Sequence, residues 1–367
     1  MSLNVAMIGC GSISGIYLHN ITKVFKEIEL IGVCDLIRER AERAQKEYNV
    51  PNLYETMHDA FADPDVDIVL NLTRPYQHFE VTKAALEAGK SVYSEKPLGA
   101  SLDEGIELVR IAKEKGLMLG GAPDTFMGAG IQTSRRLLDS GFIGEPVGAA
   151  AFFNCRGHES WHTDPDFYYQ FGGGPMFDMG PYYITALINL LGGVSGVCGM
   201  VRTTFQERLI TAEPHFGEII KVNCPTYIHG SMRFDSGIIG SIWTTFDAYA
   251  SQTPRIEIYG TEGSLSVPDP NCFGGPVSIW RPEDGHWKEF PLMFPYADNS
   301  RGLGLADFAK SIETGRCARS DWHQTLHVLE VMESFTTSSD TGKYIEITSK
   351  YNRTKPMDPA YKFGILD

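Results

Sequence analysis

The chain has 367 residues, 43% of them hydrophobic and 21% charged, and it carries a formal net charge of −14 at pH 7. This length predicts two domains, each large enough to bury a core without disulfide bonds. The acidic balance and the lack of a basic block argue against nucleic acid as a partner.

Residues 3–15 carry three signals in one place. An apolar run predicts a buried strand, Gly9 and Gly11 follow with G-x-G spacing, and the next apolar residues fall on one face of a helix. Such a turn can bind a diphosphate through unpaired N–H groups and the positive end of the helix dipole. We therefore expect Gly9, Gly11, Ser12 and Ile13 to contact a dinucleotide. The alternative is a plain connecting turn, because the third small position of the fingerprint holds serine.

A second apolar run, residues 29–34, ends at Asp35, twenty residues beyond Gly15. An acidic residue at this place holds the ribose diol of a dinucleotide. Its charge would repel the 2′-phosphate of NADP, so NAD is the expected cofactor. Arg38 keeps NADP open, because an arginine can accept that phosphate, and a helix N-cap remains the structural alternative for Asp35.

The alternation of strand and helix continues to about residue 120. Strands are expected at 68–72, 91–94 and 117–120, and helices at 37–48, 77–88 and 102–115. Repeated units of this kind with short connections require a parallel sheet with right-handed crossovers. Residues 1–122 are therefore predicted to form a doubly wound domain that binds ligands at the carboxyl ends of its strands.

Polar residues follow the first of those later strands. Thr73 and Pro75 are expected to pack beside the cofactor, and His78 opens the next helix. We include His78 among the expected cofactor contacts. A lone histidine more often caps or packs on its own helix, and that alternative stays open.

Glu95, Lys96 and Pro97 follow the strand at 91–94. The proline holds the preceding backbone extended, which would aim the ammonium group of Lys96 at the cleft. The alternative is a surface pair of Glu95 and Lys96 with little energetic weight.

After residue 122 the pattern changes to segments separated by turn residues. Strands are expected at 148–155, 196–205, 227–234, 238–246, 255–259, 264–267 and 277–280, with helices at 130–140, 303–313 and 322–337. This pattern predicts a second domain over residues 123–350, built on a mostly antiparallel sheet, and a tail over residues 351–367. An open sheet face must be covered, so we expect a homodimer or homotetramer that forms across it.

Residues 158–162 match the metalloprotease signature H-E-x-x-H, which needs His158 and His162 on one helix face. Gly157 and Pro165 leave no room for that helix, so we expect an accidental match and no metal. A zinc hydrolase remains the alternative that this match raises.

Residues 179–201 contain no charged side chain. A membrane span is the weaker interpretation, because Pro181 suits the first turn of a helix and two glycines would end that helix early. With a helix starting near Met179, Asp178 and Tyr182 are i and i+4 neighbours at its positive end. A nearby ammonium group would then lower the pKa of the phenol. The alternative is a structural N-cap aspartate and a buried tyrosine.

The glycine turn, the Glu95-Lys96-Pro97 strand end and the glycine run that leads to Asp178 and Tyr182 together resemble the family of glucose–fructose oxidoreductase and inositol dehydrogenase. The resemblance implies a Rossmann domain joined to an α/β domain with a large open sheet. It also implies an NAD(P)-dependent oxidoreductase acting on a sugar, cyclitol or related polyol.

In this resemblance Lys96 matches the catalytic lysine of the family and Asp178 its active-site aspartate. Tyr182 stands where many members carry histidine, so Tyr183 and His162 remain rivals as acid and base. The polar and aromatic residues expected to contact a polyol are Asn154, Arg156, Trp161 and His162. We expect the phenol and the ammonium group to meet at the nicotinamide.

A competing function is a regulator that binds NAD(P) without turnover, but the presence of Lys96 favours an enzyme.

Seven scattered cysteines without C-x-x-C spacing indicate a reducing compartment, so a cytoplasmic location is expected. Residues 4–8 are too short for the apolar core of a signal peptide.

Overall fold

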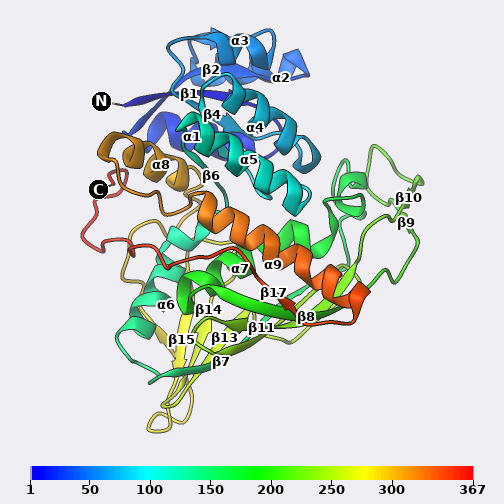
Figure 1. Cartoon of the computed structure of the whole chain (residues 1–367), viewed down its shortest axis with the longest axis vertical. Helices are drawn as coiled ribbons and strands as arrows, with labels where there is room; N and C mark the ends of the chain where they lie inside the picture. Colours follow the sequence, from blue (N-terminus) through cyan, green and yellow to red (C-terminus); the bar gives the residue numbers. More distant parts are fainter. Residues whose placement is uncertain (1, 367) are drawn as a thin grey trace. The chain divides into compact units, whose positions relative to one another are not determined.

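The structure is a computed structural model and describes residues 2–366. The chain folds into two compact units, which Figure 1 colours along the sequence. The first unit comprises Met1–Ala129, Met293–Leu326 and Thr354–Asp367, and the second comprises Gly130–Leu292 and His327–Arg353. The chain therefore passes between the units four times, whereas the sequence pattern placed residues 123–350 in one domain and residues 351–367 in a tail.

The first unit is built on a six-stranded sheet in the order β3-β2-β1-β4-β5-β6, and all its pairings are parallel. This is the doubly wound arrangement predicted from the sequence, and its strand order reverses between β1 and β4. The strands are β1 (Leu3–Ile8), β2 (Ile28–Cys34), β3 (Asn52–Leu53), β4 (Ile68–Asn71), β5 (Ser91–Ser94) and β6 (Leu119–Gly121). The helices are α1 (Ser14–Lys23), α2 (Arg38–Tyr48), α3 (Met57–Ala62), α4 (His78–Glu87), α5 (Leu102–Lys115) and α8 (Leu303–Thr314), with short 3-10 turns at η1 (Pro75–Gln77) and η2 (Thr125–Met127).

Continuous apolar runs explain the central strands. All four residues of β4 are buried, as are the last four of β1, because helices cover both faces of a parallel sheet. Local signals mark both ends of α5 where the sequence pattern predicts them. Ser101 accepts a hydrogen bond from the N–H of Glu104 at the start of this helix, and Gly116 ends the helix in the left-handed conformation.

Residues 293–326 also belong to the first unit, and Asp124 binds this segment. Asp124 follows β6 in the chain, and its side chain is buried. Its Oδ2 accepts hydrogen bonds from the N–H groups of Gly302 (2.8 Å) and Gly304 (3.0 Å) at the start of α8. Burial raises the pKa of Asp124 to about 6. Asn20 of α1 also donates to the carbonyl of Arg301. Long-range bonds of this kind have no local sequence signature.

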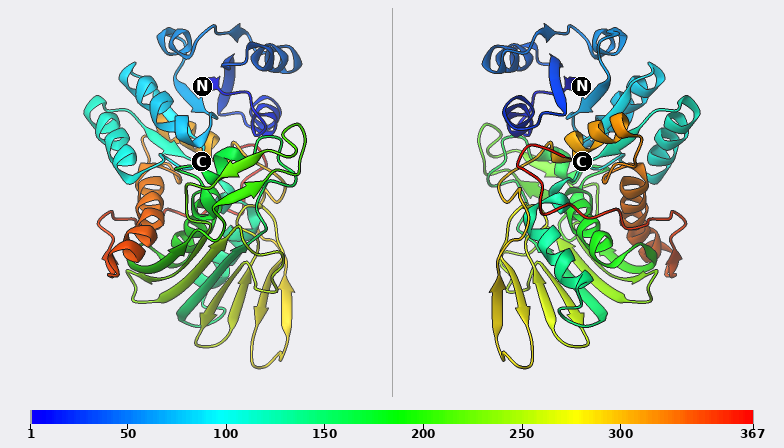
Figure 2. Two further views of the ribbon diagram at one scale, coloured as in Figure 1. Left: turned by 90° about the vertical axis from the view of Figure 1, so that its right-hand side faces the viewer. Right: turned by 90° about the vertical axis from the view of Figure 1, so that its left-hand side faces the viewer.

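The second unit contains a nine-stranded sheet in the order β16-β15-β14-β13-β7-β12-β11-β8-β17. Most pairings are antiparallel, and β12 pairs with β7 in parallel. Strands β13 to β16, yellow in the two views of Figure 2, form one edge. The strands are β7 (Pro146–Asn154), β8 (Val194–Arg202), β11 (Tyr227–Phe234), β12 (Ile239–Thr245), β13 (Ile256–Gly260), β14 (Ser264–Val267), β15 (Val277–Trp280), β16 (Trp287–Phe290) and β17 (Ile345–Glu346).

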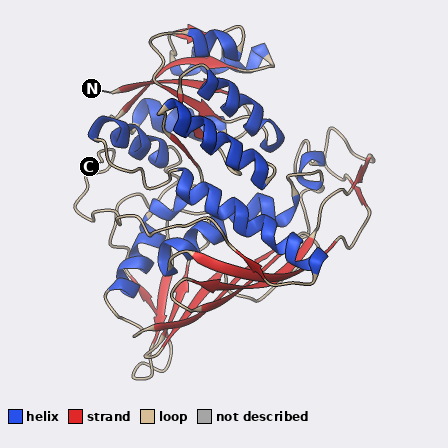
Figure 3. Ribbon diagram, in the orientation of Figure 1, coloured by secondary structure: helices blue, strands red, loops and turns tan. Residues whose placement is uncertain are grey.

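Helices cover one face of this sheet, as Figure 3 shows, and α7 (Gly174–Leu191) packs on β7, β11 and β12. Residues of β11 alternate between buried and exposed, so its other face is open. The predicted large open sheet is confirmed. The unit also includes α6 (Ala129–Asp139), most of α9 (Trp322–Thr341), the 3-10 turn η3 (Asp166–Tyr169) and a separate two-stranded sheet of β9 (Glu207–Leu209) and β10 (Ile219–Lys221), which the sequence pattern did not predict.

The structure corrects the start of the helix that carries Asp178. Helix α7 begins at Gly174, five residues before Met179, and Pro175 occupies its first turn. Pro181 lies inside the helix instead of starting it. The helix is followed by a strand, as expected, and no helix within residues 2–366 combines the length and apolarity needed to cross a membrane.

Candidate active site

The glycine turn of the first unit requires glycine at one position. Gly9 has φ of +101°, and a Cβ there would lie 2.7 Å from the carbonyl oxygen of Leu72 at the end of β4. A Cβ on Gly11, in contrast, meets no atom within 4 Å. Helix α1 then starts at Ser14, and Ile13 before it supplies no side-chain cap. The N–H of Ser14 donates to the carbonyl of Gly11 (3.2 Å), so the N–H groups that follow it in the first turn of α1 are the ones suited to bind a phosphate.

Asp35 lies at the carboxyl end of β2 and ties the glycine turn to the next helix. Its Oδ2 accepts a hydrogen bond from the N–H of Cys10 (2.6 Å), and its Oδ1 accepts one from the N–H of Ile37 (2.7 Å). Each oxygen has a second lone pair that a ribose hydroxyl can use. Asp35 thus serves the turn and fits the ribose role predicted for it.

Arg38, the residue that kept NADP open, is engaged by two carboxylates. It forms ion pairs with Glu42 (2.8 Å) and with Glu55. Its guanidinium group would have to leave these partners to bind a 2′-phosphate. These pairs are exposed and individually weak, so the charge of Asp35 remains the feature that favours NAD.

His78 occupies a buried position between two strand ends, with 1% of its surface exposed. Its Nδ1 lies 2.7 Å from the carbonyl oxygen of Pro97, and its Nε2 lies 3.0 Å from that of Thr73. Burial lowers the pKa of His78. Both ring nitrogens face the main chain, so the ring holds the β4 and β5 strand ends together.

The residue pair after β5 is anchored from α1. Glu95 accepts a hydrogen bond from the hydroxyl of Tyr17 at Oε1 (2.7 Å) and one from the N–H of Lys96 at Oε2 (3.0 Å). Only 8% of Glu95 is exposed, whereas Lys96 is half-buried. Glu95 therefore supports the backbone that presents Lys96, and the alternative of a surface pair does not fit a carboxylate that is 8% exposed. Thr73 and Pro75, the remaining predicted cofactor contacts, follow β4. The hydroxyl of Thr73 donates a hydrogen bond to Asn71 (2.6 Å), and Pro75 begins η1.

In the second unit, Asp178 contacts a residue that the sequence analysis did not choose. The Oδ2 of Asp178 lies 3.1 Å from Nε2 of His158, and both side chains are largely buried, with 14% and 9% exposed. Asp178 is the fifth residue of α7, so the effect of the helix dipole that we expected on Tyr182 is weaker than predicted. Tyr182 follows one helical turn later on the same face and is 7% exposed.

Aromatic rings surround the imidazole of His158. The centroid of Tyr168 lies 3.9 Å away, that of Phe246 4.8 Å and that of Trp161 5.2 Å. The Nδ1 atom is buried without a protein partner. With Nε2–H donating to the Asp178 carboxylate, Nδ1 is a hydrogen-bond acceptor.

The H-E-x-x-H segment forms a turn instead of a helix. The N–H of His162 donates to the carbonyl of His158 (3.0 Å), and Nδ1 of His162 accepts the N–H of Asp164 (3.0 Å). The two imidazoles thus have different partners. Within residues 2–366 no group of three or more His, Cys, Asp and Glu side chains is arranged to hold a metal ion.

The other candidates have distinct surroundings. Tyr183 is fully buried beside Phe153, and burial raises its pKa above the usual value, which makes it a poor base. Asn154 donates to two hydroxyls, and Arg156 lies over the rings of Phe205 and Tyr249. Trp161 is 63% exposed, so its side chain is accessible to a ligand.

The comparisons with known proteins agree with this architecture. A model described as "Oxidoreductase family, NAD-binding Rossmann fold" matches residues 3–121, and the GFO/IDH/MocA C-terminal domain matches residues 131–266. The chain belongs to the GFO/IDH/MocA family. As a member it is an NAD(P)-dependent oxidoreductase, which confirms the predicted family, fold and cofactor. The alternative of a non-catalytic regulator gains no support.

Individual relatives extend over most of the chain. D-xylose dehydrogenase of Paenarthrobacter nicotinovorans is 26% identical over 358 residues, covering 91% of this chain and 90% of the relative. The scyllo-inositol 2-dehydrogenase (NAD(+)) of Bacillus subtilis is 26% identical over 71% of this chain and 72% of its own. Levoglucosan dehydrogenase in complex with NADH and L-sorbose shares the fold, with a TM-score of 0.81 at 20% identity over 95% of this chain and 99% of that chain.

Proposed function

We propose that this family member transfers a hydride between NAD and a carbinol or carbonyl carbon of a sugar, cyclitol or related polyol. Relatives named for D-xylose, scyllo-inositol and 1,5-anhydro-D-fructose support this substrate class. Nicotinamide, when bound, supplies the hydride chemistry. The protein's own groups bind the cofactor, orient the hydroxyl and move its proton.

The cofactor site that we propose is centred on the glycine turn. The N–H groups after Gly11 and at the start of α1 hold the diphosphate, and Asp35 accepts the ribose hydroxyls. Thr73 and Pro75 lie beside the cofactor, whereas His78 and Glu95 position the strand ends.

We assign the proton chemistry to Lys96, Asp178 and Tyr182. Loss of hydride from a carbinol carbon requires the hydroxyl proton to leave, and Tyr182 in its ionised phenolate form accepts it to give the neutral phenol. The ammonium group of Lys96 stabilises negative charge on oxygen. Asp178 orients the substrate hydroxyl, and His158 holds Asp178 in place. Trp161 offers its exposed side chain to the apolar side of a sugar.

The contact between His158 and Asp178 carries this assignment, because it fixes a carboxylate on the same face of α7 as Tyr182. The test compares Tyr182→Phe with Tyr183→Phe in a screen of sugars and cyclitols. Tyr182→Phe should lower kcat by about 10²–10⁴-fold and leave NADH binding intact. Tyr183→Phe is the matched control and should keep nearly full turnover, because its hydroxyl is buried and burial raises its pKa. Full turnover in Tyr182→Phe, or in Asp178→Asn, would overturn the assignment.

We further propose a homodimer or homotetramer that forms across the open face of the nine-stranded sheet, and a cytoplasmic location. Exposed residues on β11 and the large sheet face support the first. Seven free cysteines support the second. Light scattering of the purified protein tests the oligomer, and a monomer would contradict it.

A further inference from the structure

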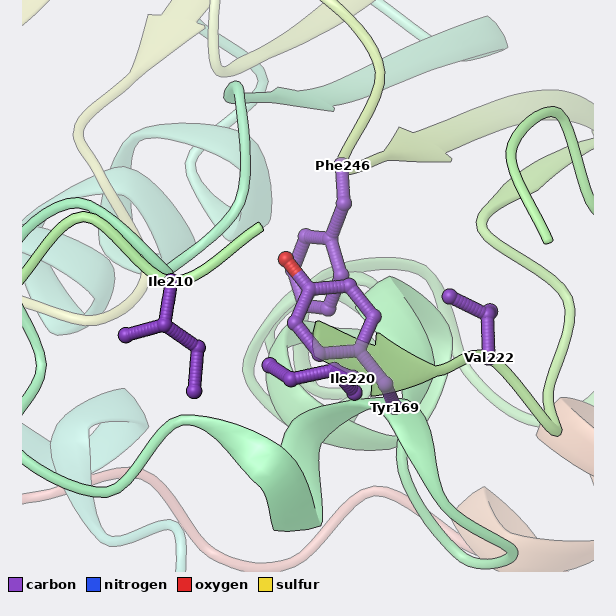
Figure 4. Close-up of a cluster of buried hydrophobic side chains, with 5 residues drawn as sticks. All are labelled: Tyr169, Ile210, Ile220, Val222 and Phe246. Atoms are coloured by element: carbon purple, nitrogen blue, oxygen red, sulfur yellow. The ribbon is translucent and has the colours of Figure 1, made fainter. Parts of the chain in front are cut away.

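The loop that carries His158 has no helix or strand of its own to hold it. Residues 155–165 follow β7 as an irregular segment, yet His158 must stay within hydrogen-bond distance of Asp178. A second segment, residues 203–226, contains β9 and β10 and packs against this loop. Its Ile210, Ile220 and Val222 form a buried cluster with Tyr169 and Phe246, which Figure 4 shows.

A buried arginine on β9 lies at the centre of this contact. Arg208 is 3% exposed, and its Nη1 pairs with Glu159 at 2.9 Å. Its Nη2 pairs with Asp247 and also donates to the carbonyl of Phe246 at 3.2 Å. The guanidinium group thus joins two carboxylates from separate parts of the chain.

Each of these two carboxylates belongs to a residue that is next in the chain either to His158 or to a ring beside it. Glu159 is its neighbour in the chain, and its carbonyl accepts the N–H of Thr211 at 2.8 Å. Asp247 follows Phe246, whose ring faces the imidazole at 4.8 Å. The hydroxyl of Tyr169 bonds Glu159 and also accepts the N–H of His158 at 3.3 Å. Arg208 therefore holds Glu159, which follows His158 in the chain, and Asp247, which follows the Phe246 ring beside the imidazole.

Stability alone does not account for such a cluster. Removing three charges from water is costly, and replacing a buried ion network by apolar groups is often neutral or stabilising. A planar guanidinium fork, however, sets the directions of both carboxylates at once.

We propose that Arg208 is a positioning residue for the reaction: by joining Glu159 to Asp247 it holds His158 against Asp178. This inference rests on the proposed function, because it assigns to His158 the orientation of the catalytic aspartate. Arg208 itself touches neither substrate nor cofactor in this scheme.

The test measures kcat, KM and their pH profiles in the full-length Arg208→Met and Arg208→Lys variants. Arg208→Met should lower kcat about 10–100-fold, since small misplacements of reacting groups cost that much, with NADH binding unchanged. Asp178 loses its donor, which raises the pKa of its carboxyl group, so the ratio of variant to wild-type kcat should fall as the pH is lowered. Arg208→Lys should regain stability but only part of kcat, because an ammonium group cannot bridge both carboxylates in the same geometry.

Lys221→Met is the matched control, because it removes an exposed cation from β10 outside the network. If Arg208→Met folds poorly, the triple variant Arg208→Met, Glu159→Gln, Asp247→Asn removes the charges together and should fold, while its kcat stays low. Unchanged kcat and pH profile in a folded Arg208 variant would overturn the inference while loss of turnover in Asp178→Asn still supports the proposed function. Full turnover in Asp178→Asn would overturn both.

Discussion

The candidate groups of the first unit and those of the second are fixed in different ways. In the first, polar side chains bind main-chain groups at the strand ends: Asp35 accepts the N–H of Cys10, and His78 contacts the carbonyl of Pro97. In the second, charged side chains bind one another: Arg208 joins Glu159, 49 residues away, to Asp247, 39 residues away. The first arrangement follows from strand ends that a parallel sheet brings together, and the second depends on a segment added between strands.

The two kinds of contact should differ in their tolerance of substitution. A mutation cannot remove a main-chain N–H or carbonyl group that serves as a partner. The candidate site of the first unit therefore depends on a few side chains and on glycine at position 9. The ion network of the second unit depends on every member, because one missing partner leaves a buried charge uncompensated. Four substitutions distinguish the two kinds of contact experimentally.

Lys96→Ala tests whether the first unit supplies chemistry as well as cofactor binding. Loss of the ammonium group should lower kcat by about 10²–10³-fold, because charge on oxygen is no longer stabilised. NADH binding, followed by fluorescence, should persist. Lys115→Ala removes an exposed lysine of the same unit and should leave turnover alone. Wild-type turnover in Lys96→Ala would confine the role of the first unit to binding.

His327 provides a pH test of the second unit. Its Nε2 accepts the N–H of Val194 (3.0 Å), its Nδ1 contacts the hydroxyl of Ser349 (2.8 Å), and burial lowers its pKa to about 4. The unfolded chain therefore binds a proton near pH 6.5 that the folded chain binds only near pH 4, so stability falls as pH drops through this window. The loss should reach about 3 kcal/mol.

Denaturant unfolding at several pH values measures that loss. His327→Gln keeps one donor and one acceptor and should flatten the pH dependence, whereas substitution of the exposed His229 should leave the slope as it is. An unaltered slope in His327→Gln would assign the acid sensitivity to other groups.

Asp35→Asn tests the choice of cofactor. The neutral side chain no longer repels a 2′-phosphate, and it forms weaker bonds with ribose hydroxyls. We expect NAD affinity to fall about tenfold, or about 1.4 kcal/mol, and NADP affinity to fall less. The ratio of the two dissociation constants is the measurement, since any general weakening of the turn cancels in it. An unchanged ratio would contradict the role of Asp35.

Substitution of Arg110 should have the smallest effect of the four. It pairs with Glu107 (2.7 Å) and Glu114 (2.6 Å) on the exposed side of α5, and these ion pairs are open to solvent. Arg110→Ala should change the free energy of unfolding by no more than about 1 kcal/mol and leave kcat unaffected. An effect as large as that of Arg208→Met would remove the distinction between exposed and buried ion pairs.

Local patterns predicted the parallel sheet and the glycine turn, because each depends on neighbours within one strand–turn–helix unit. Asp35 was found by its distance from the turn. The start of α7 was misjudged because Pro181 resembles a first-turn proline, while Pro175 behind three glycines takes that place. Propensity cannot tell two such prolines apart, since the choice depends on what covers the helix.

Contacts without a sequence period were missed. His158 lies 20 residues from Asp178 in an irregular loop, and its only sequence signal was an apparent metal motif. β9 and β10 have three residues each, too short to show an alternation. Residues 303–313 were assigned to the second domain, but hydrogen bonds to Asp124 hold this helix in the first unit. A helix pattern does not reveal which sheet the helix covers.

The four passages of the chain between the units bear on synthesis at the ribosome. An N-terminal domain usually folds first, as a unit, while the remainder is still being made. Here the N–H of Leu366 bonds Glu27 (2.9 Å), and the N–H of Gly364 bonds the hydroxyl of Tyr296 (3.1 Å). The first unit therefore cannot complete these contacts until residues 364–366 have been synthesised, and a fragment that stops at residue 122 would lack α8 and both hydrogen bonds.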